Sequence, residues 1–401
     1  MGKDTFGFSR RRLLQGTAAV AGAYAASKMV GGSLIGHAHA QFAPSKDALL
    51  IINLRGGYNS IFTGADSFLG SGAYSVTSSN IRDLGNGLFV DTSTFGTLPA
   101  PALASMATVG VRHGINSHEN SQDAMFHFNN QSAVLMLADA MGGEGSIKAA
   151  HFGGVPGSHP PVGSTSLQRI TDMGSTIAAL GGVTNLSMPD REIAAKGMAA
   201  ARAMSSRELR ANPASLSTVD QGYPAAIDTL QQPVKVFNFA EAAQAYGLNA
   251  TATGVGSFTS QMLAAELMVH AGTNVIVAQN GGWDTHGDRS AATVRQMMTR
   301  NILPGLRTFL NRMWSADGYN VTVAIVGEFA RSLPGSDDQP SVSVTVIGKN
   351  VKVGTTGKTD ANVRLAAGTP TFPGLWAYLA TVTSVKGTPF GANPHTALVK
   401  A

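Results

Sequence analysis

The chain has 401 residues, of which 13% are charged, and its formal net charge is +5. It contains no cysteine, which excludes disulfides, thiolate catalysis and cysteine-ligated zinc or iron–sulfur sites. Residues 1–40 hold five basic residues and one acidic residue, so the rest of the chain has 24 basic and 23 acidic residues and a net charge of +1. This near balance does not indicate a nucleic-acid partner.

The first forty residues have the pattern of an export signal. Ser9-Arg10-Arg11-Arg12 precedes an apolar stretch, residues 17–35, in which only Lys28 is charged, as in a twin-arginine signal. Ala38-His39-Ala40 then predicts cleavage after Ala40. The alternative is a membrane anchor, but several glycines make the stretch less apolar than the roughly 20 residues of a spanning helix. We therefore expect export by the twin-arginine translocase, a periplasmic or extracellular location, and no stable membrane span after cleavage.

The remaining chain alternates between predicted strands and helices. Residues 48–54 form an apolar run before Arg55-Gly56-Gly57, which is typical of a strand buried on both faces. The same patterns predict strands at 108–112, 273–278, 321–326 and 343–347, and helices at 98–106, 121–141, 240–246, 257–271, 291–314 and 372–382. This alternation predicts an α/β fold: a doubly wound, mostly parallel sheet with helices on both faces.

Residues 142–250 have a less regular pattern. Residues 142–165 are rich in glycine and proline and predict a loop, and a helix is expected at 190–211. We expect this region to form a helical or loop insertion, or a cap, on a single domain that spans residues 46–401.

Polar residues follow several of the predicted strands, where ligands of parallel sheets bind. Asp284 and His286 lie two residues apart after Gly281-Gly282 and could face one divalent metal ion. Alternatively, Asp284 caps the next helix beside a surface histidine.

Two further strand ends leave similar alternatives open. Ser117, next to His118, could be a nucleophile at a helix N-terminus, where anions bind, or an ordinary N-cap. Glu328 and Arg331 could form a simple ion pair. Alternatively, Glu328 could support a metal ligand while Arg331 holds an anionic substrate.

These motifs resemble the twin-arginine-exported bacterial proteins grouped as domain of unknown function 1501, relatives of the alkaline phosphatase and sulfatase superfamily. The resemblance runs from about Leu49 to the C-terminus and is weakest at 142–250. It rests on the leader and on Arg55-Gly56-Gly57, Ser117-His118, Gly281-Gly282-Trp283-Asp284-Thr285-His286 and Gly327-Glu328-Phe329-Ala330-Arg331. It implies an alkaline-phosphatase-like domain in which one or two zinc, manganese or calcium ions support hydrolysis of anionic phosphate or sulfate esters.

The resemblance also implies roles for individual residues. The implied metal ligands are Asp284, His286, Asp337, Asp338 and Asn59; the implied catalytic residues are Ser117, Arg331 and Glu328; and the implied substrate-binding residues are Arg55 and His118. Asn59 stands where relatives usually have aspartate, and Asp338 where they usually have histidine. These departures leave an alternative open: a catalytically degenerate, metal-free member that acts as a periplasmic or surface binding or assembly protein.

Overall fold

The computed structural model describes residues 47–57, 77–142, 147–179, 237–288, 290–316, 318–331, 338–360 and 363–401, together with 196, 197, 199, 200 and 203. The chain divides into two compact units. One comprises residues 1–40 and 186–232; the other comprises 41–185 and 233–401 and holds all the elements below. The predicted leader lies outside the described residues, as does nearly all of the predicted helix at 190–211.

An eight-stranded sheet in the order β14-β4-β13-β10-β1-β9-β7-β8 forms the centre of the second unit. Its strands are β1 (Asp47–Leu54), β4 (Met106–Arg112), β7 (Ala149–Phe152), β8 (Leu167–Arg169), β9 (Val275–Asn280), β10 (Asn320–Val326), β13 (Ser341–Ile347) and β14 (Gly354–Thr355). Only β13 runs antiparallel to its neighbours β10 and β4. The prediction of a mostly parallel sheet in an α/β fold is confirmed.

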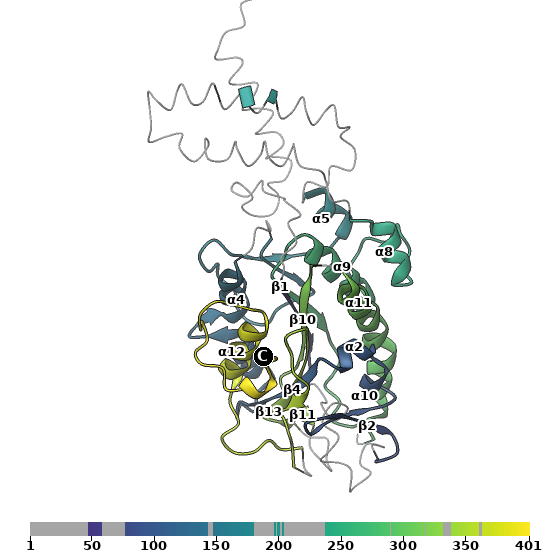
Figure 1. Ribbon diagram of the computed structural model, residues 1–401, viewed down its shortest axis with the longest axis vertical. Coiled ribbons are helices and arrows are strands. Elements are labelled where there is room, and N and C mark those ends of the chain that lie inside the picture. Colours follow the sequence, from purple (N-terminus) through teal and green to yellow (C-terminus); the bar gives the residue numbers. More distant parts are fainter. Residues whose placement is uncertain are drawn as a thin grey trace, which may run out of the picture. The chain divides into compact units, whose positions relative to one another are not determined.

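Helices cover both faces of this sheet (Figure 1). One face carries α4 (Ala133–Met141) and α12 (Phe372–Val382), and the other carries α2 (Ala100–Leu103), α9 (Phe258–His270) and α11 (Leu303–Ser315). The smaller elements are β2 (Ile81–Gly85), β3 (Leu88–Asp91), α3 (His118–Phe126), β5 (His127–Phe128), β6 (Gln131–Ser132), α5 (Met173–Ala179), α8 (Phe239–Ala245), α10 (Ala292–Met297), β11 (Ala330–Arg331) and β12 (Asp338–Gln339). Among the described residues, no helix is long and apolar enough to cross a membrane.

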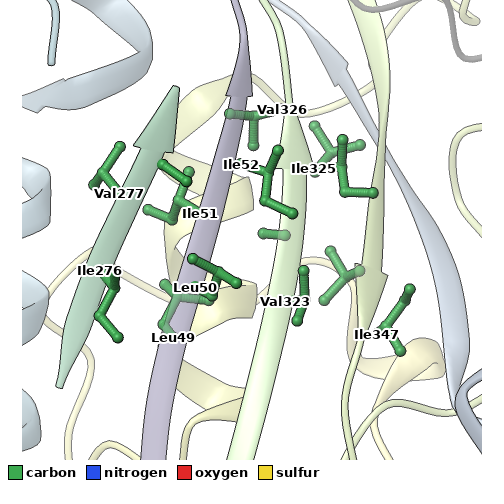
Figure 2. Packing of buried hydrophobic residues seen from close by; sticks show 14 of the residues in the cluster. Leu49, Leu50, Ile51, Ile52, Ile276, Val277, Val323, Ile325, Val326 and Ile347 are labelled. Atoms are coloured by element: carbon green, nitrogen blue, oxygen red, sulfur yellow. The ribbon is translucent and has the colours of Figure 1, made fainter. Parts of the chain in front are cut away.

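The core is built around β1, which lies between β10 and β9. Leu49, Leu50, Ile51 and Ile52 are each at most 1% exposed, because helices pack on both faces of this strand. They contact apolar side chains of the neighbouring strands, such as Ile276 (Figure 2). Full burial of each such side chain contributes roughly 1.5–3 kcal/mol, and this core fixes the strand ends that carry the polar residues.

Four predicted elements differ from the observed ones. The predicted helix 121–141 is two helices, α3 and α4, separated by the β5–β6 hairpin. Asn129 and Asn130 have φ angles of 49° and 60°, a left-handed conformation that asparagine tolerates and that tight hairpin turns require. The predicted loop 142–165 contains β7, which pairs with β9. The predicted helix 98–106 ends at Leu103, and a π-helical segment, Met298–Ile302, joins α10 to α11.

Candidate functional site

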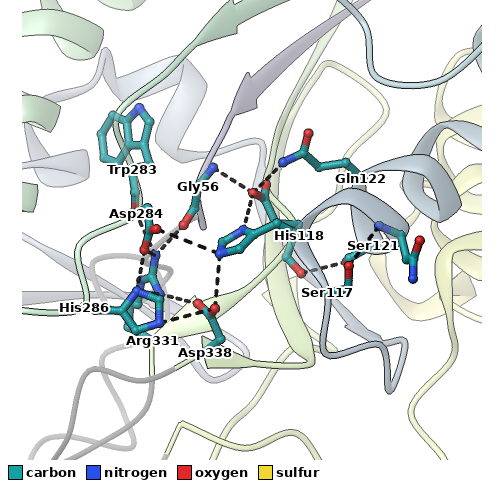
Figure 3. A network of polar contacts seen from close by, with 12 residues as sticks. Gly56, Ser117, His118, Ser121, Gln122, Trp283, Asp284, His286, Arg331 and Asp338 are labelled. Atoms are coloured by element: carbon teal, nitrogen blue, oxygen red, sulfur yellow. Dashed lines mark hydrogen bonds and ion pairs between the residues drawn. The ribbon is translucent and has the colours of Figure 1, made fainter.

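The polar residues predicted at separate strand ends meet at one edge of the sheet. Because β1, β4, β9 and β10 run parallel, their carboxyl ends lie at the same edge. The loops that follow them, and the β11–β12 hairpin, bring six of the predicted site residues together: His118, Asp284, His286, Glu328, Arg331 and Asp338 (Figure 3). We call these six residues the strand-end cluster.

Two glycines after β1 allow the loops to approach this closely. Gly56 and Gly57 have φ angles of +113° and +117°, in the region that favours glycine. A Cβ atom on Gly56 would overlap the backbone nitrogen of Asp284, and one on Gly57 would lie 2.8 Å from Nη2 of Arg331. The two glycines of the Arg55-Gly56-Gly57 motif are thus required by close packing against the loops after β9 and β10.

Glu328 holds the imidazole of His118 in place through a hydrogen bond. The Glu328 side chain is fully buried, and its Oε1 accepts hydrogen bonds from the backbone N of Gly56 at 2.8 Å, from Nε2 of Gln122 at 2.8 Å and from Nδ1 of His118 at 3.0 Å. Since Nδ1 of His118 donates to this carboxylate, Nε2 of a neutral imidazole carries the lone pair. That Nε2 lies 3.3 Å from Oδ2 of Asp338 and 4.0 Å from Oδ2 of Asp284.

His286 has the same orientation on the other side of the cluster. Its Nδ1 donates to Oδ1 of Asp284, and its Nε2 lies 3.4 Å from Oδ2 of Asp338. The two Nε2 atoms therefore point towards one carboxylate oxygen. If both imidazoles are neutral, these atoms are all acceptors, and such a set is electrostatically unfavourable unless a proton or a cation lies among them.

Arg331 pairs with both aspartates of the cluster. Its side chain is fully buried; Nη1 donates to Oδ1 of Asp338, and Nη2 donates to the carbonyl oxygens of Gly56 and Trp283 and to Oδ1 of Asp284. The guanidinium is therefore held by protein acceptors. This burial does not support the expected role of Arg331 as a clamp on substrate.

The two aspartates have opposite shifts in pKa. Partial burial raises the pKa of Asp284, but the hydrogen bond and charge of His286, together with the charges of Arg331 and His118, outweigh burial and lower the pKa below its usual value. For Asp338 burial is the larger effect, and it raises the pKa despite the nearby charge of Arg331. Asp284 is therefore the stronger acid of the two.

Among the described residues, the other two predicted site residues, Ser117 and Arg55, form no hydrogen bond or ion pair with the cluster. Ser117 is the N-cap of α3 and accepts a hydrogen bond from the backbone N of Asn120 at 3.4 Å; in Figure 3 it lies on the side of His118 away from Asp284. Arg55 is exposed at the end of β1. Asn59 and Asp337 lie outside the described residues.

Gln122, which the sequence did not single out, and His113, a polar residue just after the second predicted strand, complete the surroundings of Glu328. Gln122 follows His118 by four positions on α3, so both side chains lie on one helix face. This spacing could have identified Gln122 from the sequence. His113 donates from Nε2 to the backbone oxygen of Glu328 at 2.7 Å and stacks on Phe372 with ring centroids 5.0 Å apart. Burial lowers the pKa of His113 to about 4, so this imidazole is neutral and holds the loop after β10.

The donor atoms of the cluster are of the chemical kinds that bind divalent metal ions. Two imidazole nitrogens and two carboxylate oxygens form a mixed set that zinc and manganese accept. As the side chains stand, within the described part of the chain no group of three or more His, Asp or Glu residues is arranged to hold a metal ion. The carboxylates are instead bonded directly to Arg331 and His286.

The fold and this site define an α/β protein with a histidine–carboxylate cluster at the strand ends. The family model described as "Protein of unknown function (DUF1501)" matches residues 163–371, just over half of the 401 residues. The chain belongs to this family, as its motifs predict. The matched segment includes Asp284, His286, Glu328, Arg331 and Asp338.

Other comparisons add little. No curated protein matches the sequence. The solved structure titled "Crystal structure of Ps i-CgsB in complex with k-i-k-neocarrahexaose" is 10% identical, with 88% of this chain and 76% of that chain covered and a TM-score of 0.35. At that TM-score the similarity carries no argument about function.

Proposed function

We propose that this chain is an exported, metal-dependent hydrolase of phosphate or sulfate esters that acts at the strand-end cluster. The observation that carries the proposal is the orientation of His118 and His286. Each donates Nδ1–H to a carboxylate and directs Nε2 towards Oδ2 of Asp338, at 3.3 Å and 3.4 Å. A carboxylate that fixes the orientation of a histidine in this way is typical of metal-binding histidines.

In this proposal, His118, His286, Asp284 and Asp338 hold a zinc, manganese or calcium ion. Such an ion would withdraw electron density from an ester oxygen and offset negative charge in the transition state. Glu328 keeps the ring of His118 in place and increases its basicity through the 3.0 Å hydrogen bond. Asn59 and Asp337 stay predicted ligands.

The substrate contacts follow from the positions of Arg55 and Ser117. Arg55 is exposed at the end of β1, where its guanidinium can pair with an anionic ester. Ser117 lies at the N-terminus of α3, where the helix dipole favours an anion. Its hydroxyl oxygen would form a bond to phosphorus or sulfur while the bond to the leaving oxygen breaks, and the hydroxyl proton would pass to the leaving alcohol. Water would then attack the phosphorus or sulfur atom, release the acid and return a proton to the serine oxygen.

The export signal completes the proposal. The twin-arginine motif at Arg10-Arg11-Arg12 and the small residues at Ala38 and Ala40 support transport by the twin-arginine translocase and cleavage after Ala40. The mature protein would then act in the periplasm or outside the cell.

Metal content and ester hydrolysis test the proposal together. The mature protein is purified from the periplasm without chelators or metal-affinity steps, its metals are quantified, and a panel of phosphate and sulfate monoesters and diesters is screened. We expect bound metal and turnover, both lost in Asp284→Asn. The matched control is Asp123→Asn, because Asp123 also pairs with a histidine, His127 at 3.1 Å, but lies outside the cluster. Folded, metal-free protein without turnover would contradict the proposal.

A metal-free binding protein is the second candidate. It is favoured by Arg331, which already pairs with both Asp284 and Asp338, so these carboxylates do not depend on a metal ion for a positive partner. The double variant Asn59→Asp, Asp338→His distinguishes the two candidates. Hydrolysis that is absent from the parent and present in this variant would support a degenerate binding protein.

A further inference from the structure

In both Asp284 and Asp338, the two carboxylate oxygens have different neighbours. In each carboxylate, Oδ1 contacts a nitrogen of Arg331, at 3.1 Å for Asp284. Oδ1 of Asp284 also accepts a hydrogen bond from Nδ1 of His286. Oδ2 of Asp284 lies 4.0 Å from Nε2 of His118, and Oδ2 of Asp338 lies 3.3 Å from the same atom and 3.4 Å from Nε2 of His286. Arg331 thus occupies the Oδ1 atoms of both aspartates, and the Nε2 atoms of the two histidines lie near the Oδ2 atoms.

The guanidinium of Arg331 is held in a fixed position. Arg331 is fully buried, and Nη2 also donates to the carbonyl oxygens of Gly56 and Trp283. Gly57 leaves the space that Nη2 fills, since a Cβ atom there would lie 2.8 Å from it. Because arginine does not lose its proton in proteins, this positive charge is permanent.

The charges of the cluster leave room for one divalent ion. Asp284, Asp338 and Glu328 contribute three negative charges. Arg331 contributes one positive charge, so two negative charges remain on the six residues of the cluster when both imidazoles are neutral. One divalent cation balances them. A second divalent ion would need the Oδ1 atoms, which Arg331 already occupies, and would be repelled by its charge.

We propose that the strand-end cluster binds a single divalent ion, and that Arg331 permanently takes the position of a second cation. This inference rests on the proposed function only in that it requires the cluster to bind metal. It makes the site mononuclear, unlike two-metal centres, whose ions lie about 3.5–4 Å apart.

Manganese titration of the full mature chain tests the inference. Isothermal titration calorimetry gives the number of Mn²⁺ ions bound, and electron paramagnetic resonance shows whether bound ions are magnetically coupled. We expect one equivalent with the hyperfine spectrum of an isolated ion. Two equivalents with an exchange-coupled spectrum would overturn the inference and leave the proposed hydrolase intact. One equivalent without ester turnover would support the inference and contradict the hydrolase, and no binding would contradict both.

Removal of the guanidinium provides the second measurement. Arg331→Ala frees both Oδ1 atoms, and we expect its stoichiometry to rise to two Mn²⁺ per chain with magnetic coupling. The matched control is Arg295→Ala, because Arg295 also pairs with a buried aspartate, Asp91 at 2.7 Å, outside the cluster. A folded Arg331→Ala protein that still binds one ion would overturn the role given to Arg331. If circular dichroism shows that this variant does not fold, the number of Mn²⁺ ions bound by the wild-type protein alone tests the inference.

Discussion

Gly56 and Asp284 are in direct backbone contact across the ends of β1 and β9. A Cβ atom on Gly56 would overlap the backbone nitrogen of Asp284 and lie 2.8 Å from the carbonyl carbon of Trp283. Neither partner atom belongs to a flexible side chain, so the overlap can be relieved only by a backbone shift. Such a shift would move Asp284 relative to His118 and Asp338.

Gly56→Ala should therefore destabilise the protein and disturb the site. The positive φ of +113° costs a residue with a side chain roughly 1–3 kcal/mol, and overpacking adds about 1–3 kcal/mol. Urea unfolding measures the loss of stability. Gly281→Ala is the control, because Gly281 belongs to the companion Gly-Gly pair but has no atom within 4 Å of its added Cβ. Equal effects of the two substitutions would show that contact with Asp284 is unimportant.

Glu328→Gln should weaken metal binding while the protein stays folded. Glutamine has the same shape as glutamate and can keep the hydrogen bonds from Gly56 and Gln122, but it removes the charge behind His118. Loss of such a supporting carboxylate typically lowers metal affinity about 10–100-fold, which calorimetry with Zn²⁺ or Mn²⁺ would detect. Glu119→Gln, an exposed change beside His118, should leave the affinity unchanged. If the two variants bind alike, Glu328 has no positioning role.

The sequence predicted the sheet because its central strands are long apolar runs. Residues 48–54, 273–278 and 321–326 could bury both faces only inside a parallel sheet, and parallel strands bring their carboxyl ends to one edge. That rule alone places Asp284 and Glu328 in a common site. Strand β7 was missed because its four residues, Ala149–Phe152, are too short to show a period within a glycine-rich stretch.

The contacts inside the cluster were less predictable. The spacing of Glu328 and Arg331 indicated a shared site but not that Arg331 is fully buried. That burial depends on Gly56 and Gly57, which are far away in sequence and whose positive φ angles create the space. The two-helix arrangement of residues 118–141 was missed because it depends on the left-handed turn at Asn129 and Asn130.

Substitutions at Ser117 can separate its capping role from catalysis. Ser117 accepts the backbone hydrogen bond from Asn120, so Ser117→Ala should cost about 0.5–2 kcal/mol of stability. Ser117→Asn supplies another good cap without a hydroxyl, and we expect its stability to stay near that of the parent. If Ser117 is the nucleophile, ester turnover is lost in both variants. Full turnover in Ser117→Asn would assign this residue to helix capping alone.

His395 should make the fold sensitive to acid. The side chain is 2% exposed, and burial lowers its pKa from 6.5 to about 4. Since the unfolded chain takes up a proton below pH 6.5 and the folded chain resists it until about pH 4, the stability from this residue is complete above pH 6.5 and is lost between these values. A shift of one unit is worth about 1.4 kcal/mol, so the loss between pH 7 and pH 5 is about 2 kcal/mol.

His395→Asn tests this origin of the pH dependence. Asparagine can keep the hydrogen bond that joins Nδ1 of His395 to Oγ1 of Thr356 at 2.9 Å, but it does not titrate. Urea unfolding at pH 7 and pH 5 should show a pH-dependent loss of stability that is smaller in the variant by about 2 kcal/mol. His113 and His151, whose pKa values burial also lowers to about 4, contribute equally to both proteins and cancel in the comparison. An identical loss in variant and parent would show that His395 does not resist protonation in the folded state.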